Sequence, residues 1–217
     1  MGRLRNEQAG ATYQVVARGV DRRRIFVDDE DYRTYLGLLA IVTARQGWHL
    51  LCYCLMPNHV HLLIETPETN LGNGIQWLHG RYARAFNKRH ERVGHLFEAP
   101  YKSLIVTEET LVRTVGYIVA NPMAAALCKR LADWPWGSHT AVADGEPPEW
   151  LAHARLLDHL EDAAGFRCYG DLVTARELLC SEQIAVSRQQ AGERRARNGD
   201  APDAMPASAL SATRAVL

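Results

Sequence analysis

The sequence has no long apolar run, no disulfide-type spacing of cysteines and no excess of one charge. No segment approaches the roughly 18 apolar residues that cross a membrane, and residues 1–7 lack the apolar centre of a signal peptide. The five cysteines form an odd, scattered set, which favours reduced thiols in a reducing compartment. Zero formal net charge argues against a generic nucleic-acid coat protein. We therefore expect a soluble intracellular protein without a membrane partner.

What the chain does have is enough apolar content for one well-buried domain. It contains 217 residues, of which 47% are hydrophobic. We predict a first domain over residues 1–140 and a helical C-terminal appendage over residues 141–186. Residues 187–217 are dominated by small and polar residues and lack aromatics, which is typical of a disordered tail.

Charge is distributed unevenly along the chain. Residues 1–105 carry 14 Lys and Arg against 10 Asp and Glu, a net charge of +4, and the remainder carries 11 against 15, a net charge of −4. Two basic clusters stand out, Arg22 to Arg24 and a helical stretch between Arg81 and Arg92. Such clusters can bind phosphates, or they can be solvated surfaces without a ligand.

The hydrophobic pattern predicts an α+β fold. Strand, helix, strand, strand, helix and strand follow one another, which is the split βαβ order of a ferredoxin-like fold with one antiparallel sheet and helices on one face. A further helix follows the last strand and is expected to end at Asn121-Pro122, because a residue before proline is pushed out of the helical region. The expected strands are residues 12–18, 48–55, 59–65 and 101–106, and the expected helices are residues 28–46, 71–90 and 111–120.

His59 and His61 flank one apolar residue at the start of a predicted strand. Side chains alternate across a strand, so both imidazoles point to one face and form half of a divalent-metal site. The alternative is an edge strand with two solvated histidines. A zinc site that joins them to Cys52 and Cys54 is a further alternative, although strand cysteines lack the usual zinc-knuckle spacing.

Tyr117 and Asn121 lie four residues apart on the last predicted helix, so they share one face of it. A tyrosine next to a metal that polarises a phosphate can attack phosphorus and form a phosphotyrosine. The amide oxygen of Asn121 would add a third, harder ligand, which suits Mg²⁺ or Mn²⁺. By spacing alone, a tyrosine such as Tyr117 is more often a core aromatic.

Several blocks of the sequence stand in the order that one known family shows. They are Arg18-Gly19 with Arg22 to Phe26, Met56-Pro57-Asn58-His59-Val60-His61, Phe97-Glu98 with Tyr101-Lys102-Ser103, Tyr117 with Asn121-Pro122, and Trp134-Pro135-Trp136-Gly137. On these blocks, residues 13 to 138 resemble the HUH single-tyrosine, IS200-like transposases, in the branch called REP-associated tyrosine transposases. One departure is the end of the tyrosine motif, where Ala124 and Ala126 replace the cation and the glycine that are usual in the family.

The resemblance implies a metal-dependent enzyme in which Tyr117 attacks single-stranded DNA. His59, His61 and Asn121 would bind the Mg²⁺ or Mn²⁺ ion, and the products would be a 5′-phosphotyrosyl enzyme and a free 3′-hydroxyl. The expected DNA is a palindromic repeat that folds into a hairpin, and the expected location is the bacterial cytoplasm, at the nucleoid. The residues that would contact DNA are Arg18, Arg22, Arg23, Arg24, Arg81, Arg84, Lys88, Arg89 and Lys102.

Two questions stay open at this point. The chain could have kept the fold as a catalytically idle DNA-hairpin-binding protein. The branch is expected to act as a monomer, whereas in some relatives two subunits exchange the tyrosine helix.

Overall fold

The computed structural model describes residues 7–98, 101–143 and 147–164, which contain one sheet and the helices around it. The predicted tail over residues 187–217, and the appendage beyond residue 164, lie outside the described residues. In chain order the elements are β1 (Ala11–Arg18), η1 (Val20–Arg22), α1 (Asp29–Gln46), β2 (His49–Met56), β3 (His59–Thr66), α2 (Leu71–Arg89), β4 (Lys102–Val106), α3 (Glu108–Ala124), η2 (Leu131–Asp133), α4 (Ser138–Ala143) and α5 (His153–Ala164).

The sheet confirms the predicted α+β, ferredoxin-like topology. Its strands lie in the order β2-β3-β1-β4, and each neighbouring pair is antiparallel. Strands β2 and β3 are joined by the two-residue turn Pro57-Asn58, as expected for a hairpin. Strand β3 is paired with β2 on one edge and with β1 on the other. His59 and His61 therefore do not lie on an edge strand.

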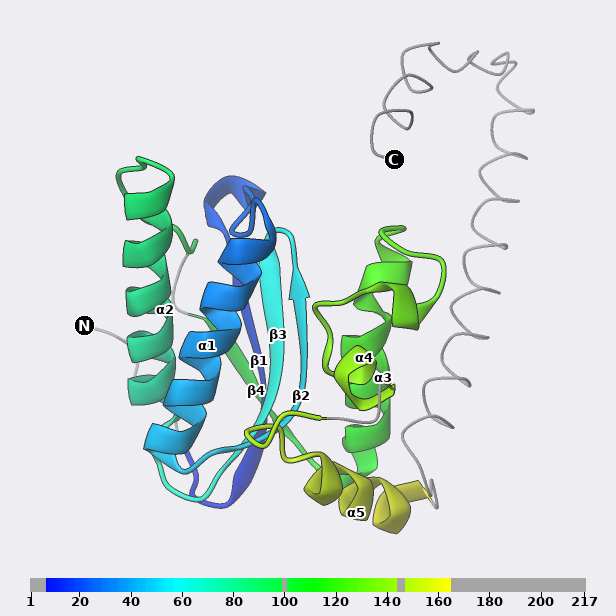
Figure 1. The fold of residues 1–217 in the computed structure, drawn as a ribbon. Helices are drawn as coiled ribbons and strands as arrows, with labels where there is room; N and C mark the ends of the chain where they lie inside the picture. The colour runs from blue at the N-terminus through cyan, green and yellow to red at the C-terminus, as the bar shows by residue number, and fades with distance from the viewer. Residues whose placement is uncertain (1–6, 99–100, 144–146, 165–217) are drawn as a thin grey trace, which may run out of the picture. The chain divides into compact units, whose positions relative to one another are not determined.

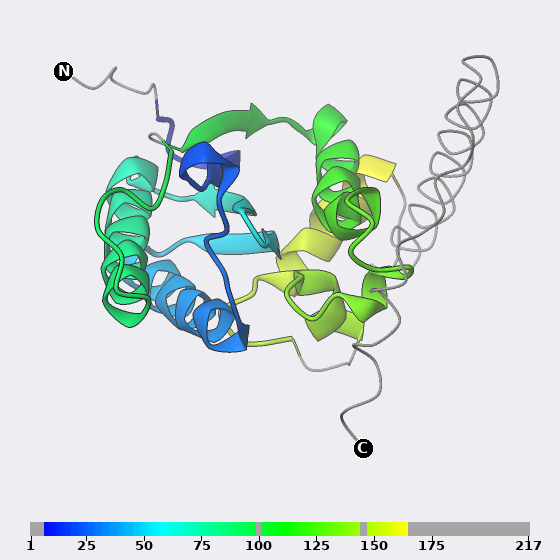
Figure 2. The same cartoon turned by 90° about the horizontal axis from the view of Figure 1, so that it is seen from above.

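The two helices of the split βαβ unit lie on one face of the sheet, as predicted, and the helices that follow β4 cover the other face. Helices α1 and α2 lie on one side, and α3, α4 and α5 lie on the other (Figures 1 and 2). The physical reason is the composition of β2, whose residues from Leu50 to Met56 are all buried, so both faces of the strand need an apolar cover. On this second face, Leu156 and Leu160 of α5 are buried in one apolar core together with residues of α3.

Helix α3 runs through Asn121-Pro122 to Ala124, so the prediction that it ends before the proline is wrong. Pro122 has no N–H to donate to the carbonyl oxygen of Ile118. The side-chain amide of Asn121 offsets this loss. Its Nδ2 lies 2.7 Å from the carbonyl oxygen of Tyr117 and 3.5 Å from that of Ile118. The asparagine before the proline therefore helps the helix to continue.

The loop after β1 holds the β2–β3 turn in place. The backbone N–H of Gly19 donates to the carbonyl oxygen of Asn58 at 2.9 Å, and that of Ile25 donates to Pro57 at 2.8 Å. Gly19 is required here because a Cβ atom at this position would lie 2.3 Å from the carbonyl oxygen of Arg23. The loop and the turn thus form one unit that fixes the start of β3.

A buried carboxylate ties helix α5 to the sheet. Glu65 of β3 accepts hydrogen bonds from Arg155 Nε at 2.7 Å and from Arg155 Nη2 at 2.5 Å. His159 Nε2 lies 3.2 Å from the same carboxylate. Burial alone would raise the pKa of Glu65, but the bonds from Arg155 and His159 outweigh burial and lower it. Glu65 therefore has a structural role.

Replacing Glu65 by glutamine is expected to lower the free energy of unfolding by about 1 kcal/mol near pH 7, because Arg155 loses its charged partner. Since the pKa of Glu65 is lowered on folding, its contribution is present above the ordinary value of 4.5 and is lost as the pH falls through the folded-state pKa. Urea unfolding near neutral pH and near pH 3 measures this. The exposed Glu68→Gln variant is the matched control, and an equal difference at both pH values would contradict the assignment.

Ala126 adopts a left-handed backbone conformation with a φ of +56° just after α3. A Cβ atom makes this conformation costly, and glycine avoids the cost. We expect Ala126→Gly to raise the free energy of unfolding by about 1 kcal/mol, as seen in the midpoint of urea unfolding. Ala125→Gly, at a φ of −84°, serves as the control and is expected to destabilise the fold.

Candidate active site

The two histidines of β3 project from one face of the sheet toward helix α3. His59 pairs in register with Arg18 of β1, and His61 pairs with Val16. The imidazole centroids lie 4.9 Å apart. His61 is only 2% exposed, whereas His59 is half-buried. Strand alternation therefore places both rings at one point of the sheet, as the sequence predicts.

Asn58 fixes the orientation and tautomer of His59. Its Nδ2 donates to the carbonyl oxygen of Arg22 at 3.0 Å, which places Oδ1 on the other side of the amide. This Oδ1 lies 2.7 Å from His59 Nδ1. Because an amide oxygen only accepts, Nδ1 carries the proton and Nε2 keeps its lone pair. His59 thus presents Nε2 as a potential metal ligand.

His61 is a buried imidazole without a hydrogen-bond partner. Both Nδ1 and Nε2 are buried, and neither finds a partner among the residues that the structure describes. Burial, together with the nearby charges of His59 and Arg18, lowers the pKa of His61 to about 3. Burial also lowers the pKa of His59 to about 4. Both rings are therefore neutral near pH 7, the state in which imidazole binds metals.

Tyr117 reaches the histidine pair from helix α3. Its ring centroid lies 5.5 Å from that of His61, and the two rings are nearly perpendicular. The side chain is 48% exposed although its neighbours Gly116 and Ile118 are buried. A ligand from solvent can therefore reach the ring of Tyr117, although the histidine next to it is buried. Tyr117 is therefore not a core aromatic.

Asn121 lies one turn after Tyr117 and faces the same two imidazoles. Burial lowers the pKa of both His59 and His61, and the nearby Asn121 side chain raises it by a smaller amount. The amide nitrogen is occupied by the carbonyl groups of α3, which leaves the amide oxygen for the imidazole side. The oxygen predicted as a third metal ligand is thus on the correct side of the helix.

These residues fit a divalent metal ion. The set offers two neutral imidazole nitrogens and one amide oxygen, and no group of three His, Cys, Asp or Glu forms in the described part of the chain. The unpartnered nitrogens of His61 support the fit, because buried polar atoms without a partner are costly and a cation would satisfy one of them. Mixed nitrogen and oxygen ligands suit Mn²⁺ well and are acceptable to Mg²⁺.

Comparison with known proteins identifies the family. The family model described as IS200-like transposase matches residues 7–121, which is more than half of the chain. The protein belongs to the IS200-like transposase family. A Haemophilus influenzae protein described as a REP-associated tyrosine transposase is 29% identical over 111 residues, which cover 45% of this chain and 63% of that relative. The chain thus spans less than two thirds of this relative's length.

A solved structure with the same fold is a REP-associated tyrosine transposase bound to a REP hairpin. Its TM-score with this chain is 0.57 at 18% identity, and the match covers 68% of this chain and 88% of the other. At this identity the likeness concerns the fold alone. The family assignment confirms the resemblance inferred from the motifs, and the match covers His59, His61, Tyr117 and Asn121.

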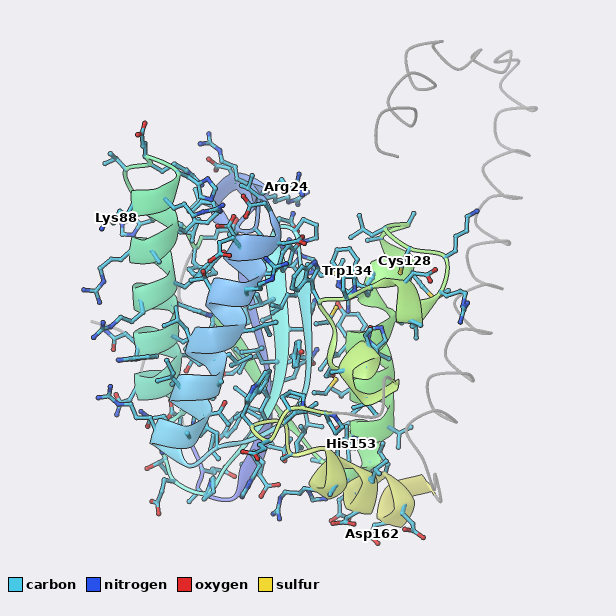
Figure 3. All side chains as sticks on the ribbon, in the orientation of Figure 1. Arg24, Lys88, Cys128, Trp134, His153 and Asp162 are labelled. Carbon is cyan, nitrogen blue, oxygen red and sulfur yellow. The ribbon has the colours of Figure 1, made fainter. Side chains whose placement is uncertain are left out.

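Among the cations predicted to contact DNA, five lie at or near the histidine pair. Arg18 is exposed and pairs with His59 in the sheet. Lys102 of β4 shares the register row of His61, two strands or roughly 10 Å away. Arg22, Arg23 and Arg24 are exposed on the loop that holds the hairpin turn, where Figure 3 shows Arg24.

The other four predicted cations lie on α2, across the sheet from α3. Figure 3 shows Lys88 on the side of α2 that faces away from the sheet. Arg81 lies over the ring of Trp77, and Arg84 donates to the carbonyl oxygen of Gly80 in its own helix. Arg89 binds Asp28 and Asp31 at 2.7 Å each. A DNA contact on α2 would therefore involve DNA far from Tyr117.

The alternative zinc site is not formed. Cys54 pairs with His61 in register, but no cluster of three metal-binding His, Cys, Asp or Glu side chains exists among the described residues. Cys52 and Cys54 belong to the apolar core between the sheet and α3. Burial raises the pKa of Cys54 well above its ordinary value, which disfavours the thiolate that zinc requires.

The sequence interpretation missed the role of Asn58. Its position directly before His59 and inside the two-residue turn was the available signal, because a turn asparagine often bonds to nearby groups. Its partner, the carbonyl oxygen of Arg22, lies 36 residues earlier and could not be read from the motif.

We expect Asn58→Ala to weaken Mn²⁺ binding by about 10- to 100-fold, because His59 loses the acceptor that fixes its tautomer. Isothermal titration calorimetry of the DNA-free protein measures this without reference to activity. Asn73→Ala on α2 is the matched control. Unchanged Mn²⁺ affinity in Asn58→Ala, with a fold preserved by circular dichroism, would show that the Asn58–His59 bond does not act on a metal.

Proposed function

We propose that the protein is a metal-dependent endonuclease and strand transferase that acts on single-stranded DNA. The observation that carries this proposal is the position of Tyr117, whose accessible ring lies 5.5 Å from that of His61 while Asn121 sits beside both imidazoles. Neither packing nor hairpin binding requires a tyrosine, two neutral histidines and an asparagine at one point.

In the proposed reaction the phenol oxygen of Tyr117 forms a bond to phosphorus. The bond from phosphorus to the 3′-oxygen breaks, the 3′-oxygen takes up a proton, and the phenol proton passes to solvent at the exposed side of the ring. The 5′-phosphate stays on Tyr117. Attack by another 3′-hydroxyl reverses these steps and releases the tyrosine, so strands can be joined without ATP.

A bound Mg²⁺ or Mn²⁺ ion would neutralise charge on the phosphate oxygens. His59, His61 and Asn121 would hold it. Asn58 keeps His59 in one tautomer, and the rigid pairing of β3 on both edges keeps the two imidazoles in place. Arg18 and Lys102 both lie on the β1–β4 side of the pair and would attract the DNA backbone there.

The proposed substrate is DNA that folds into a hairpin, with cleavage in the adjacent single strand. The relatives support this, because one is described as REP-associated and another was solved on a REP hairpin. The exposed cations Arg22, Arg23 and Arg24, held beside the β2–β3 turn, would contact the hairpin backbone. We propose that the protein acts as a monomer.

The Tyr117→Phe variant is expected to form no covalent adduct, because the nucleophilic oxygen is gone while the basic surface is intact. The assay incubates hairpin-bearing single strands, taken from the inverted repeats of the source genome, with Mn²⁺ or Mg²⁺. Denaturing electrophoresis then detects protein-linked DNA. Fluorescence anisotropy is expected to show unchanged hairpin affinity.

Tyr53→Phe, a buried tyrosine across the sheet from the site, is the matched control and should keep full adduct formation. Salt-sensitive hairpin binding by the wild type without any adduct would instead indicate a catalytically idle hairpin-binding protein. An adduct that persists in Tyr117→Phe would move the nucleophile to another residue.

A further inference from the structure

A groove of about 400 Å³ runs from Tyr117 along the junction of α3 with the edge strand β4. Its helix wall is formed by Thr110, Arg113, Thr114 and Tyr117, which share one helix face by their i, i+3, i+4 and i+7 spacing. Its volume lies in the range of pockets that hold drug-sized ligands. The groove begins at the proposed nucleophile and leads away from the histidine pair.

The groove contains polar side chains without partners. Gln14 of β1 is half-buried in the middle of the sheet, and its amide makes no hydrogen bond within the described part of the chain. Arg113 is exposed and has no ion pair with any described residue. Thr114 donates its hydroxyl proton to the carbonyl oxygen of Thr110 at 2.8 Å, so its oxygen remains as an acceptor. These groups can bind a ligand without breaking existing bonds.

The other wall of the groove is apolar and accessible. Leu104 of β4 is 68% exposed and lies on the same sheet face as Gln14, its partner in register. None of the side chains that line the groove in the described structure is acidic. The groove therefore combines an apolar wall, a cation and hydrogen-bonding groups for a polar edge. Single-stranded nucleic acid presents the matching parts, namely a base face, a phosphate and base edges.

We propose that this groove holds the single-stranded DNA next to the scissile phosphate, with Arg113 on a backbone phosphate, Leu104 against a base face and Gln14 against a base edge. This inference rests on the proposed function, since a strand attacked by Tyr117 must continue away from it. Gln14 would also give the protein a preference for certain DNA bases in the groove, because an amide distinguishes hydrogen-bond donors from acceptors on base edges.

Binding to a fluorescent oligothymidylate of about 12 nucleotides tests the groove. The full-length protein is titrated in EDTA, so that no cleavage is required. Arg113→Ala is expected to weaken binding about fivefold to tenfold and to reduce the slope of log affinity against log salt by about 0.7, the value for one phosphate contact. Leu104→Asp is expected to weaken binding about tenfold.

Two surface variants on α1, across the sheet from the groove, serve as matched controls. Arg33→Ala removes an exposed cation, and Ile41→Asp adds a charge at an aliphatic side chain that is 54% exposed. Both should bind the oligothymidylate as the wild type does. Crosslinking places the strand directly, because p-benzoylphenylalanine at position 104 should capture the oligonucleotide under light and the same group at position 41 should not.

The inference is overturned if Arg113→Ala and Leu104→Asp, folded by circular dichroism, bind with the affinity and salt slope of the wild type. It is also overturned if they change only the sedimentation coefficient, since the groove would then be covered by a second copy of the chain. These results are separate from the adduct assay. Groove-dependent binding without an adduct would refute only the nuclease, and an adduct with groove-independent binding would refute only the groove.

Discussion

Strand β3 is hydrogen-bonded along both edges, and this double pairing determines where every side chain of the site points. A strand held between β1 and β2 cannot slip by one residue without moving its whole apolar set to the wrong face. Val60, Leu62 and Ile64 are fixed in one core, so His59 and His61 must face the other side. The apolar alternation that stabilises the sheet is thus also what aims the imidazoles.

Helix α3 completes the site because the same core that holds it also sets its rotation. Leu111, Val115, Ile118 and Val119 are buried against the sheet. Tyr117 and Asn121 lie on the neighbouring face of the helix and are left at the margin of this interface, beside the two imidazoles. The chemistry therefore sits at the boundary between an apolar core and solvent, where neutral histidines and an accessible phenol can coexist.

Local physics predicted much of this arrangement, and long-range packing accounts for the rest. Strand parity is a local property, so the shared face of His59 and His61 followed from their spacing. The meeting of Tyr117 with His61 depends on a contact between residues 56 positions apart, and only the family motif indicated it. The unbroken apolar run of β2 indicates that both of its faces are covered, but it does not say which helices cover the second face. The role of Asn58 depends on the carbonyl oxygen of Arg22, which is distant in the sequence. The continuation of α3 past Pro122 depends on the side-chain amide of Asn121.

The bonds of Asn121 link helix integrity to ligand geometry. With its amide nitrogen committed to the carbonyl groups of Tyr117 and Ile118, the side chain cannot flip without removing the donor that replaces the missing N–H of Pro122 at the carbonyl oxygen of Ile118. Asn121 and Pro122 are consequently epistatic. Aspartate at position 121 would keep an oxygen but lose the donor that the helix uses, and a residue with an N–H at position 122 would free the amide to rotate.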